Sequence, residues 1–374
     1  MSDPVPFFSL GRLYDEQKSE IDQAVLRALG SGHFILGKEC EAFEQAFAGI
    51  LGAERRVVGC NSGTDALVLS LIAAGVNVGD EVICPSHTAI PTITAIRSAG
   101  GTPVFVDVDA KTWILSAEGI AAALTPRTKA VVCVHLYGNV VDIDAVQAKL
   151  AERGRTDVSI IEDVAQASGS SLRGKQAGTM GRFGAFSFYP TKNLGALGDA
   201  GAIAATQDDA DRLKMFRNYG QKDRYNAEVS RGVNSRLDEV QAAVLRVRLS
   251  RLGAWSARKN TLVARYREEL AGLPFAFQSV TPGAVPEWHL FVIATESNAV
   301  REALSKHLGD NGIGALVHYP HPTHLQKAFR SETPPSLPVT EGLASRILSL
   351  PMNPTVTDAE CANVIGQVRS FFGS

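Results

Sequence analysis

One lysine, Lys192, stands where an apolar segment (186–188) passes through hydroxyl-bearing residues into a glycine-rich run (195–201). A lysine in such a loop is either a solvated surface residue or a desolvated amine of lowered pKa, which is the form that carries a carbonyl group as a Schiff base. The glycines of 195–201 are evenly spaced and lead into a strand, so they do not form the dinucleotide-binding fingerprint.

Three further segments place polar groups beside regular elements. In 160–166 an apolar strand runs straight into Glu162 and Asp163. At the carboxyl edge of an α/β sheet such an aspartate can pair with a protonated ring nitrogen, or it can cap the next helix. The Ser-Gly-Thr turn of 61–67 can offer N–H groups to a phosphate or merely cap a helix. The segment 232–243 enters a long helix and can be a simple helix start.

The elements that position these segments alternate between short apolar runs and helical stretches. This pattern predicts an α/β sheet covered by helices on both faces. We predict strands at 57–60, 81–84, 103–106, 130–135, 158–161, 185–188 and 201–205, and helices at 16–29, 39–51, 64–74 and 90–99.

The C-terminal part has a different organisation. A charged helical stretch at 238–270 leaves the large domain, and it is followed by strands at 289–294 and 315–318 with a helix at 299–308 between them. We therefore predict a large α/β domain with an N-terminal helical segment over residues 1–250, and a small α+β domain over 251–374.

Composition narrows the class of partner. The chain has 37 Lys and Arg against 39 Asp and Glu, which gives no basic footprint for nucleic acid and no polybasic membrane patch. No apolar run reaches the length of a membrane span, and the first ten residues lack the pattern of a signal peptide. The five cysteines are scattered, which suits a reducing cytoplasm and neither a disulfide framework nor a zinc site. We expect a cytoplasmic protein that binds small molecules.

Taken together and in this order, the four segments resemble the DegT/DnrJ/EryC1/StrS family of sugar aminotransferases, which are pyridoxal-phosphate (PLP) enzymes with the fold of aspartate aminotransferase (fold type I). The resemblance covers essentially the whole chain, from Gly37 to Met352. It implies a large domain whose mixed, mostly parallel sheet is flanked by helices, and a small C-terminal α+β domain. It also implies pyridoxal 5'-phosphate as the cofactor.

The resemblance assigns roles to individual residues. Lys192 matches the Schiff-base lysine, which then acts as general acid and base. Asp163 matches the carboxylate that keeps the pyridine nitrogen protonated, and Gln166 matches a residue near the ring hydroxyl.

The phosphate cradle is matched in the same way. It comprises Ser187 and the backbone at Gly63 and Thr64. Asn234 matches an asparagine that reaches the phosphate bound by the other subunit, so the resemblance implies a homodimer with shared active sites.

Three positions depart from the family's pattern. Ala89 stands where an aromatic residue often stacks on the cofactor ring; His87 is either a substitute for it or a solvated or core histidine. Ser168 replaces a usual histidine, and Ala200 replaces a glycine. Because none of these changes Lys192, they bear on cofactor affinity and substrate fit and not on the chemistry.

The resemblance extends to the substrate. The loop 192–199 and the segment 318–320 are similar to those of enzymes that aminate position 3 of a hexose. We therefore predict glutamate as donor and a dTDP-linked 3-keto-6-deoxyhexose as acceptor. His318, Tyr319 and His324 either line the sugar site or serve packing.

Other functions stay open at this point. The nearest is a C-4 keto-sugar or cyclitol aminotransferase of the same family. A dehydratase is disfavoured because such relatives lack the lysine that Lys192 provides. A PLP-binding regulator without turnover is disfavoured because no helix-turn-helix module or basic arm is visible.

Overall fold

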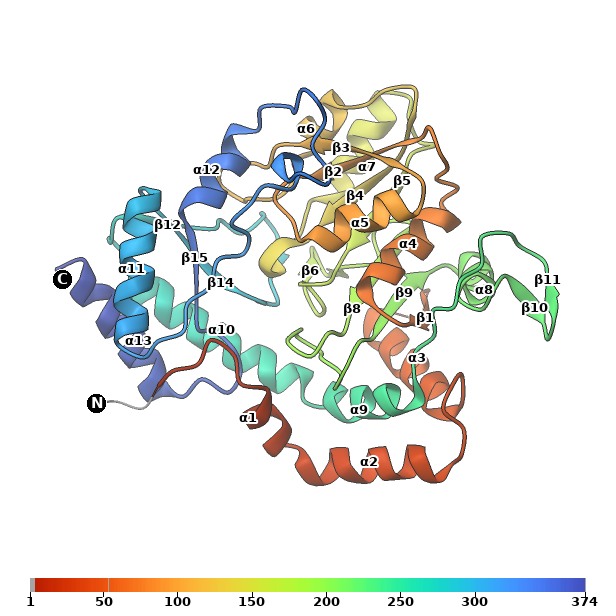
Figure 1. Cartoon of the computed structure of the whole chain (residues 1–374), viewed down its shortest axis with the longest axis horizontal. Helices are drawn as coiled ribbons and strands as arrows, with labels where there is room; N and C mark the ends of the chain where they lie inside the picture. The colour runs from red at the N-terminus through yellow and green to blue at the C-terminus, as the bar shows by residue number, and fades with distance from the viewer. Residues whose placement is uncertain (1–3, 53, 374) are drawn as a thin grey trace.

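The computed structural model describes residues 4–52 and 54–373. Its centre is a seven-stranded sheet with the order β1-β9-β8-β5-β4-β2-β3 (Figure 1). Neighbours from β8 to β3 run parallel, whereas β9 is antiparallel to both β8 and β1. The sheet is mixed and mostly parallel, as predicted. The strands are β1 (Arg56–Cys60), β2 (Glu81–Pro85), β3 (Thr102–Val106), β4 (Thr128–Val134), β5 (Ser159–Asp163), β8 (Phe183–Ser187) and β9 (Gly201–Ala205).

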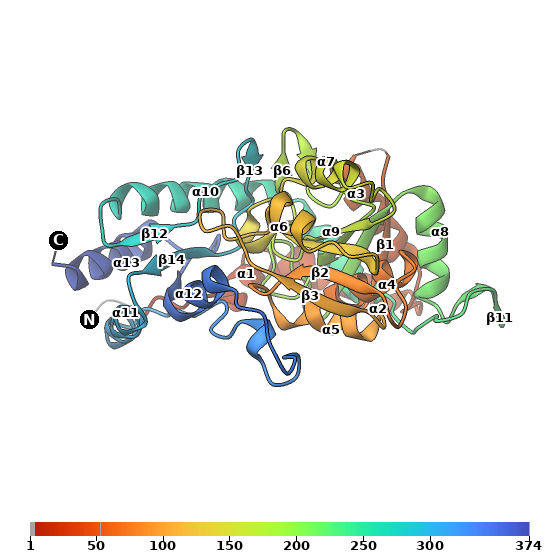
Figure 2. The same ribbon diagram turned by 90° about the horizontal axis from the view of Figure 1, so that it is seen from above.

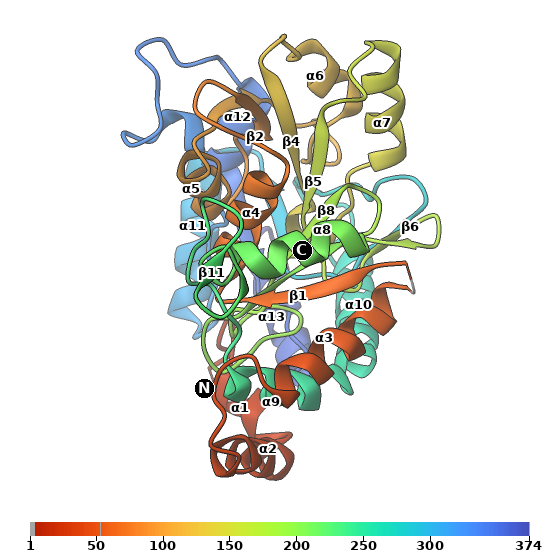
Figure 3. The ribbon, with the colours of Figure 1, turned by 90° about the vertical axis from the view of Figure 1, so that its right-hand side faces the viewer.

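Helices cover both faces of this sheet, which explains why several of its inner strands are buried along their whole length. In β2, β5, β8 and β9 every residue is buried. The helices α4 (Gly63–Ala73) and α5 (Ile90–Ser98) lie on one side, and α6 (Ala117–Ala122) and α7 (Ile143–Glu152) lie on the other (Figures 2 and 3). The helix α3 (Lys38–Leu51) packs on β1.

The predicted helix at 238–270 is two helices. The helix α9 (Glu239–Leu249) packs against α3 and against α2 (Lys18–Gly30), and α10 (Leu252–Glu269) continues toward the C-terminal part. The break falls at Ser250, whose hydroxyl donates to the carbonyl of Val247 at 2.7 Å. A serine bound back to the preceding turn competes with the helical hydrogen bonds and helps to end the helix.

The C-terminal part is built on a second, antiparallel sheet of β12 (Phe275–Phe277), β14 (Phe291–Thr295) and β15 (Ile347–Leu350). The helices α11 (Asn298–Asp310) and α13 (Asp358–Phe371) belong to the same part. A separate hydrophobic cluster joins this sheet to α10, α11 and α13, and it also includes Val5 from the N-terminal segment. The division of the chain at residue 250 stays a prediction.

The predicted strand at 315–318 was wrong. This segment makes only a single bridge, between Leu316 and Ser349. The carbonyl of His318 accepts a hydrogen bond from the Tyr137 hydroxyl, so a side chain takes the place of a ladder partner there. As a result the segment passes beside the large sheet without forming a strand.

The sheet brings the chemically interesting segments to one edge. Because β1, β5 and β8 all run in the same direction, their carboxyl ends meet there. Asp163 ends β5, Ser187 ends β8, and Gly63 begins α4 just after β1. Ligands of α/β sheets bind at this edge.

Candidate active site

A cavity of about 430 Å³ opens at this edge, which is within the usual size of a cofactor or substrate site. The sequence indicates a role in the site for ten residues, and His87 is a further candidate. Eight of these eleven residues line the cavity: Gly63, Thr64, Asp163, Gln166, Ser187, Lys192, His318 and Tyr319. They come from α4, β5, β8 and the segments that follow β5, β8 and α11. The structure thus gathers most of the predicted site in one place.

Lys192 lies in a loop that is closed by backbone hydrogen bonds. The Phe188 amide donates to the Ala200 carbonyl at 2.8 Å, and the Ala196 amide donates to the Phe188 carbonyl at 2.8 Å. The Lys192 amide donates to the Tyr189 carbonyl. Gly195 is required in this loop because a Cβ there would lie 2.3 Å from the Pro190 carbonyl oxygen. The loop therefore holds the lysine in a fixed position at the cavity wall.

Burial sets the electrostatics of Lys192 and Asp163. Desolvation lowers the pKa of Lys192 to about 8, against a smaller raising effect of the Asp163 charge. Desolvation also raises the pKa of Asp163, while hydrogen bonds and the Lys192 charge oppose this rise. With a pKa of about 8, roughly a tenth of the amine is unprotonated at pH 7, far more than for an ordinary lysine, and this form is the nucleophile.

Asp163 is held by two donors. Its Oδ2 accepts from the Thr92 hydroxyl at 2.9 Å, and its Oδ1 accepts from the Ala165 amide at 3.1 Å. The Thr92 hydroxyl in turn lies 2.9 Å from that of Thr88. The carboxylate is thereby fixed at the cavity wall, since Thr92 and Ala165 line the cavity with it.

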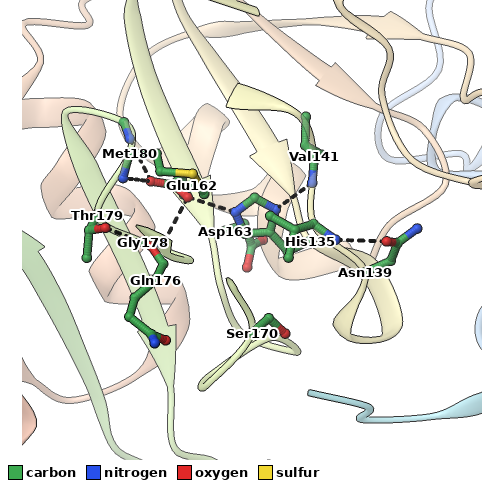
Figure 4. Close-up of polar contacts among 12 residues, drawn as sticks. His135, Asn139, Val141, Glu162, Asp163, Ser170, Gln176, Gly178, Thr179 and Met180 are labelled. Carbon is green, nitrogen blue, oxygen red and sulfur yellow. Dashed lines mark hydrogen bonds and ion pairs between the residues drawn. The ribbon is translucent and has the colours of Figure 1, made fainter. Parts of the chain in front are cut away.

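The neighbouring Glu162 points to the other face of β5, because side chains alternate along a strand. Its carboxylate accepts backbone N–H groups of Gly178, Met180 and Gly181 at 2.6–2.8 Å and contacts His135 Nε2 at 2.9 Å (Figure 4). The Nδ1 atom of His135 accepts the Val141 amide at 3.0 Å, which assigns the proton to Nε2. Glu162 is therefore a structural carboxylate beneath the site.

Gly63 and Ser187 meet closely at the start of α4. A Cβ at position 63 would lie 2.5 Å from the Ser187 Cβ and 3.0 Å from its Oγ. The first N–H groups of a helix have no partner within the helix, and here Ser62 caps only the Asp65 amide, at 3.1 Å. The N–H groups of Gly63 and Thr64, with the helix dipole, thus suit a phosphate.

Gln166 links the large sheet to the segment after α11. Its Oε1 accepts the Tyr137 amide at 2.8 Å, and its Nε2 donates to the Tyr319 hydroxyl at 2.8 Å. Burial raises the pKa of Tyr319 to about 12, so its phenol is neutral. His318 is held through Nδ1 by the Ser349 hydroxyl at 2.9 Å, and burial lowers its pKa to about 4.

The other three candidate site residues do not line the cavity. The side chain of Asn234 is exposed. His324 is fully buried, with Nδ1 at 2.6 Å from the Ser86 hydroxyl and Nε2 at 3.3 Å from Glu341 Oε1, which favours packing over sugar contact. His87 is buried edge-on against Tyr137, so it is a core histidine and does not replace the aromatic residue missing at Ala89.

Several cavity residues were missed from the sequence, among them Thr92, Thr191, Asp199 and His289. His289 was read as the start of a strand, but β14 begins two residues later and the His289 amide donates to the Tyr137 carbonyl. Its ring is buried, and desolvation followed by nearby lysine charges holds its pKa well below the usual range. Thr191 and Asp199 belong to the recognised lysine loop but were given no role, whereas no local motif marks Thr92 and His289, which reach the cavity only through folding.

The residues fit a PLP molecule. The N-terminus of α4 and the close contact of Gly63 with Ser187, which leaves no room for a Cβ, suit its phosphate. The desolvated amine of Lys192 suits its aldehyde, and the fixed carboxylate of Asp163 suits its ring nitrogen. The carboxylate of Asp163 is buried and Lys192 is half-buried, so both groups are partly withdrawn from solvent at the cavity wall.

Known proteins resemble this chain over nearly its whole length. A model of the DegT/DnrJ/EryC1/StrS aminotransferase family matches residues 15–369. The dTDP-3-amino-3,4,6-trideoxy-alpha-D-glucose transaminase of Streptomyces venezuelae is 45% identical over 98% of this chain and 96% of its own. The UDP-N-acetyl-3-dehydro-alpha-D-glucosamine 3-aminotransferase of Acidithiobacillus ferrooxidans is 39% identical over 98% and 97%. The crystal structure of S. venezuelae DesV with a ketimine intermediate superimposes with a TM-score of 0.94 at 44% identity, over 100% of both chains.

The fold, the site and these similarities define a PLP-dependent aminotransferase. The chain belongs to the DegT/DnrJ/EryC1/StrS aminotransferase family, and the predicted family, fold class and cofactor are confirmed. Among the residues that the structure describes, no helix is long and apolar enough to span a membrane.

Proposed function

We propose that this enzyme moves an amino group from glutamate to C-3 of a dTDP-linked 3-keto-6-deoxyhexose. The observation that carries the proposal is the single cavity in which Lys192, Asp163 and the Gly63–Ser187 contact come together. The regiochemistry is supported by the loop 192–199 and by the names of two relatives, each of which describes amination of position 3.

Each cavity residue has a defined task in this proposal. PLP, when bound, supplies an electron-withdrawing ring that acidifies the carbon bearing the amine. Lys192 would hold the cofactor covalently and would move a proton at the substrate carbon. Asp163 would keep a proton on the ring nitrogen, and Gln166 would bind the ring hydroxyl. The N–H groups of Gly63 and Thr64 with the Ser187 hydroxyl would bind the phosphate.

The same proposal places sugar recognition on the opposite wall. His318 and Tyr319 are fixed there by Ser349 and Gln166, so they can present neutral polar groups to hydroxyls of the sugar. His324 is left out, because its ring is buried away from the cavity. Neutral donors and acceptors suit an uncharged hexose ring better than they suit a carboxylate.

We further propose that the enzyme works as a cytoplasmic homodimer in which Asn234 reaches the partner's phosphate site. The exposed side chain of Asn234 is available to a second chain. Large apolar side chains are also exposed on α2 and just after it, namely Leu26, Leu29, Phe34 and Ile35. Such exposure supports a protein–protein contact.

The decisive experiment offers dTDP-linked 3-keto and 4-keto-6-deoxyhexoses separately with glutamate and locates the new nitrogen by NMR. Reacting atoms must approach to about 3–3.5 Å, so a site that fixes the nucleotide presents one ring carbon well. We expect amination at C-3 and a rate at C-4 that is lower by orders of magnitude. Preferential amination at C-4, or of a cyclitol, would overturn the regiochemistry.

Two controls separate the remaining alternatives. A UDP-linked 3-keto sugar tests the nucleotide, since one relative's name specifies UDP. Absorbance before and after glutamate tests turnover without any sugar. A PLP-binding regulator without turnover would show a cofactor spectrum that glutamate leaves unchanged.

A further inference from the structure

A second, smaller cavity lies behind the loop that carries Lys192. It is lined by residues from the N-terminal segment, the lysine loop, α9, α10 and the segment after β15, among them Phe8, Lys192, Asn193, Arg248, Trp255 and Lys259. Its volume of about 20 Å³ admits one or two particles of the size of water, but not an amino acid or a nucleotide. No aspartate or glutamate of the described chain lines it.

Arg248 is the unusual member of this wall. Its side chain is 1% exposed, and its Nη1 donates to the carbonyls of Gly195 at 2.6 Å and Ala196 at 3.3 Å. Its Nε and Nη2 have no partner among the described residues. Burying a charged group without compensation is costly, so its unused N–H groups require a ligand.

The balance of charge around the cavity indicates what that ligand is. The Lys259 ammonium lies 2.5 Å from the Glu287 carboxylate, so these two charges compensate each other. Lys192 is balanced by Asp163 across the active-site cavity. Within residues 4–52 and 54–373 no carboxylate forms an ion pair with the Arg248 guanidinium, and desolvation alone lowers its pKa. One positive charge remains.

We propose that this cavity is a binding site for a single halide ion, chloride under ordinary conditions, held by the two unpaired nitrogens of Arg248. One monovalent anion neutralises the remaining charge, accepts the free N–H groups and fits the space. Water would satisfy the N–H groups but would leave the charge uncompensated. This site is independent of the sugar and nucleotide on which the enzyme acts.

The site has a consequence for the catalytic lysine. Arg248 binds the backbone of the same loop that begins at Lys192, and Lys192 lines both cavities. An anion in the smaller cavity therefore stabilises the ammonium form of Lys192 and ties the loop to α9. Loss of the halide is expected to lower the pKa of Lys192 and to loosen the loop.

The direct test is a crystal structure of the PLP-loaded enzyme grown in sodium bromide. We expect an anomalous bromide peak in the cavity within hydrogen-bonding distance of the free Arg248 nitrogens. Water there, or a partner-subunit carboxylate, would overturn the proposal. Because no substrate is used, this result does not depend on the proposed sugar or on turnover.

A solution test uses thermal unfolding in potassium chloride and potassium gluconate at equal ionic strength. A ligand of the folded state raises the unfolding midpoint as its concentration rises. We expect chloride to raise the midpoint of the wild type and of Arg251→Met, in which an exposed arginine at the α9–α10 junction is lost. Arg248→Met should lose the chloride effect, and retention of the full effect would contradict the site.

A variant that fails to fold does not leave the question open. Arg248→Lys keeps the charge but has fewer and differently placed N–H groups, so it should bind bromide more weakly than the wild type. The pH dependence of PLP reloading gives a third measurement, in which gluconate should shift the midpoint for Lys192 downward relative to chloride. An unchanged midpoint would contradict an anion beside Lys192.

Discussion

Replacing Gly63 by alanine tests the phosphate cradle most sharply, because the structure defines the clash. The added Cβ would lie 2.5 Å from the Ser187 Cβ and 3.0 Å from both its Cα and its Oγ. Carbon atoms in normal contact are about 3.5–4.0 Å apart, so the start of α4 must move from the end of β8 by roughly 1 Å or more. That shift displaces the N–H groups of Gly63 and Thr64.

The expected size of the effect follows from the hydrogen bonds at risk. A hydrogen bond to a charged group contributes about 1.5–3 kcal/mol. Loss of one such bond to the phosphate weakens PLP binding about 10- to 150-fold, since about 1.4 kcal/mol corresponds to a factor of ten. Equilibrium titration of the apoenzyme with PLP, followed by absorbance, measures this change directly.

A second substitution separates the steric cause from a general loss of stability. Ser187→Gly removes the Cβ and Oγ atoms that the new methyl group would meet and leaves only the Cα at 3.0 Å. The combined variant Gly63→Ala/Ser187→Gly should bind PLP more tightly than the sum of the two single effects predicts. Wild-type affinity of Gly63→Ala, or strictly additive effects, would refute the reasoning.

Four further outcomes are expected. Lys192→Ala should abolish transamination, and borohydride should no longer fix PLP to the protein; persistent fixation would move the covalent role elsewhere. Since burial lowers the pKa of Lys192 to about 8, the rate of PLP reloading should rise with pH through about 8 and then level off, and a rise continuing to pH 10 would contradict this. Asp163→Asn should keep the fold, lose most activity and move that midpoint lower, because the carboxylate that favours the ammonium form is gone; near wild-type turnover would exclude its role. Mixing Lys192→Ala chains with Asn234→Ala chains should restore part of the activity through hybrid sites, and a fully active monomer in sedimentation would rule out sharing.

Most of the large sheet was predictable because its strands are short, apolar and separated by helices. The strand predicted at 201–205 coincides with β9, and the helix predicted at 39–51 differs from α3 by one residue. The direction in which each strand runs could not be predicted from its residues. Whether β9 runs parallel or antiparallel depends on the short connection from 188 to 200, which the sequence shows only as a glycine-rich loop.

The C-terminal part was less predictable, because its strands depend on distant partners. The strand β15 follows directly on α12 (Pro338–Arg346) without a turn signal and pairs with β14, more than fifty residues earlier in the chain. The segment at 315–318 has a strand-like composition, yet it lies at the active-site wall. There the contacts of His318 with Tyr137 and Ser349 decide its path.

The site itself was predictable only where a motif carries it. Lys192, Asp163 and Ser187 stand in recognisable segments, whereas Thr92 and His289 reach the cavity through the packing of α5 and of the segment before β14. The residues that adjust the electrostatics of the site, such as Thr92, also reach it through packing. Thr92 bonds Asp163 across 71 residues of sequence, a contact that no local pattern encodes.

The adjacent carboxylates of β5 show how the fold separates two side chains of similar chemistry. An ionised carboxylate offers about four acceptor sites. In Glu162 these are occupied by three backbone N–H groups and His135, so it has no capacity left for a ligand. Among the residues that the structure describes, Asp163 receives the Thr92 hydroxyl and the Ala165 amide alone, and it faces the cavity, so it keeps acceptor sites free. The alternation of the strand therefore assigns support to one residue and makes the other available to a protonated ring nitrogen.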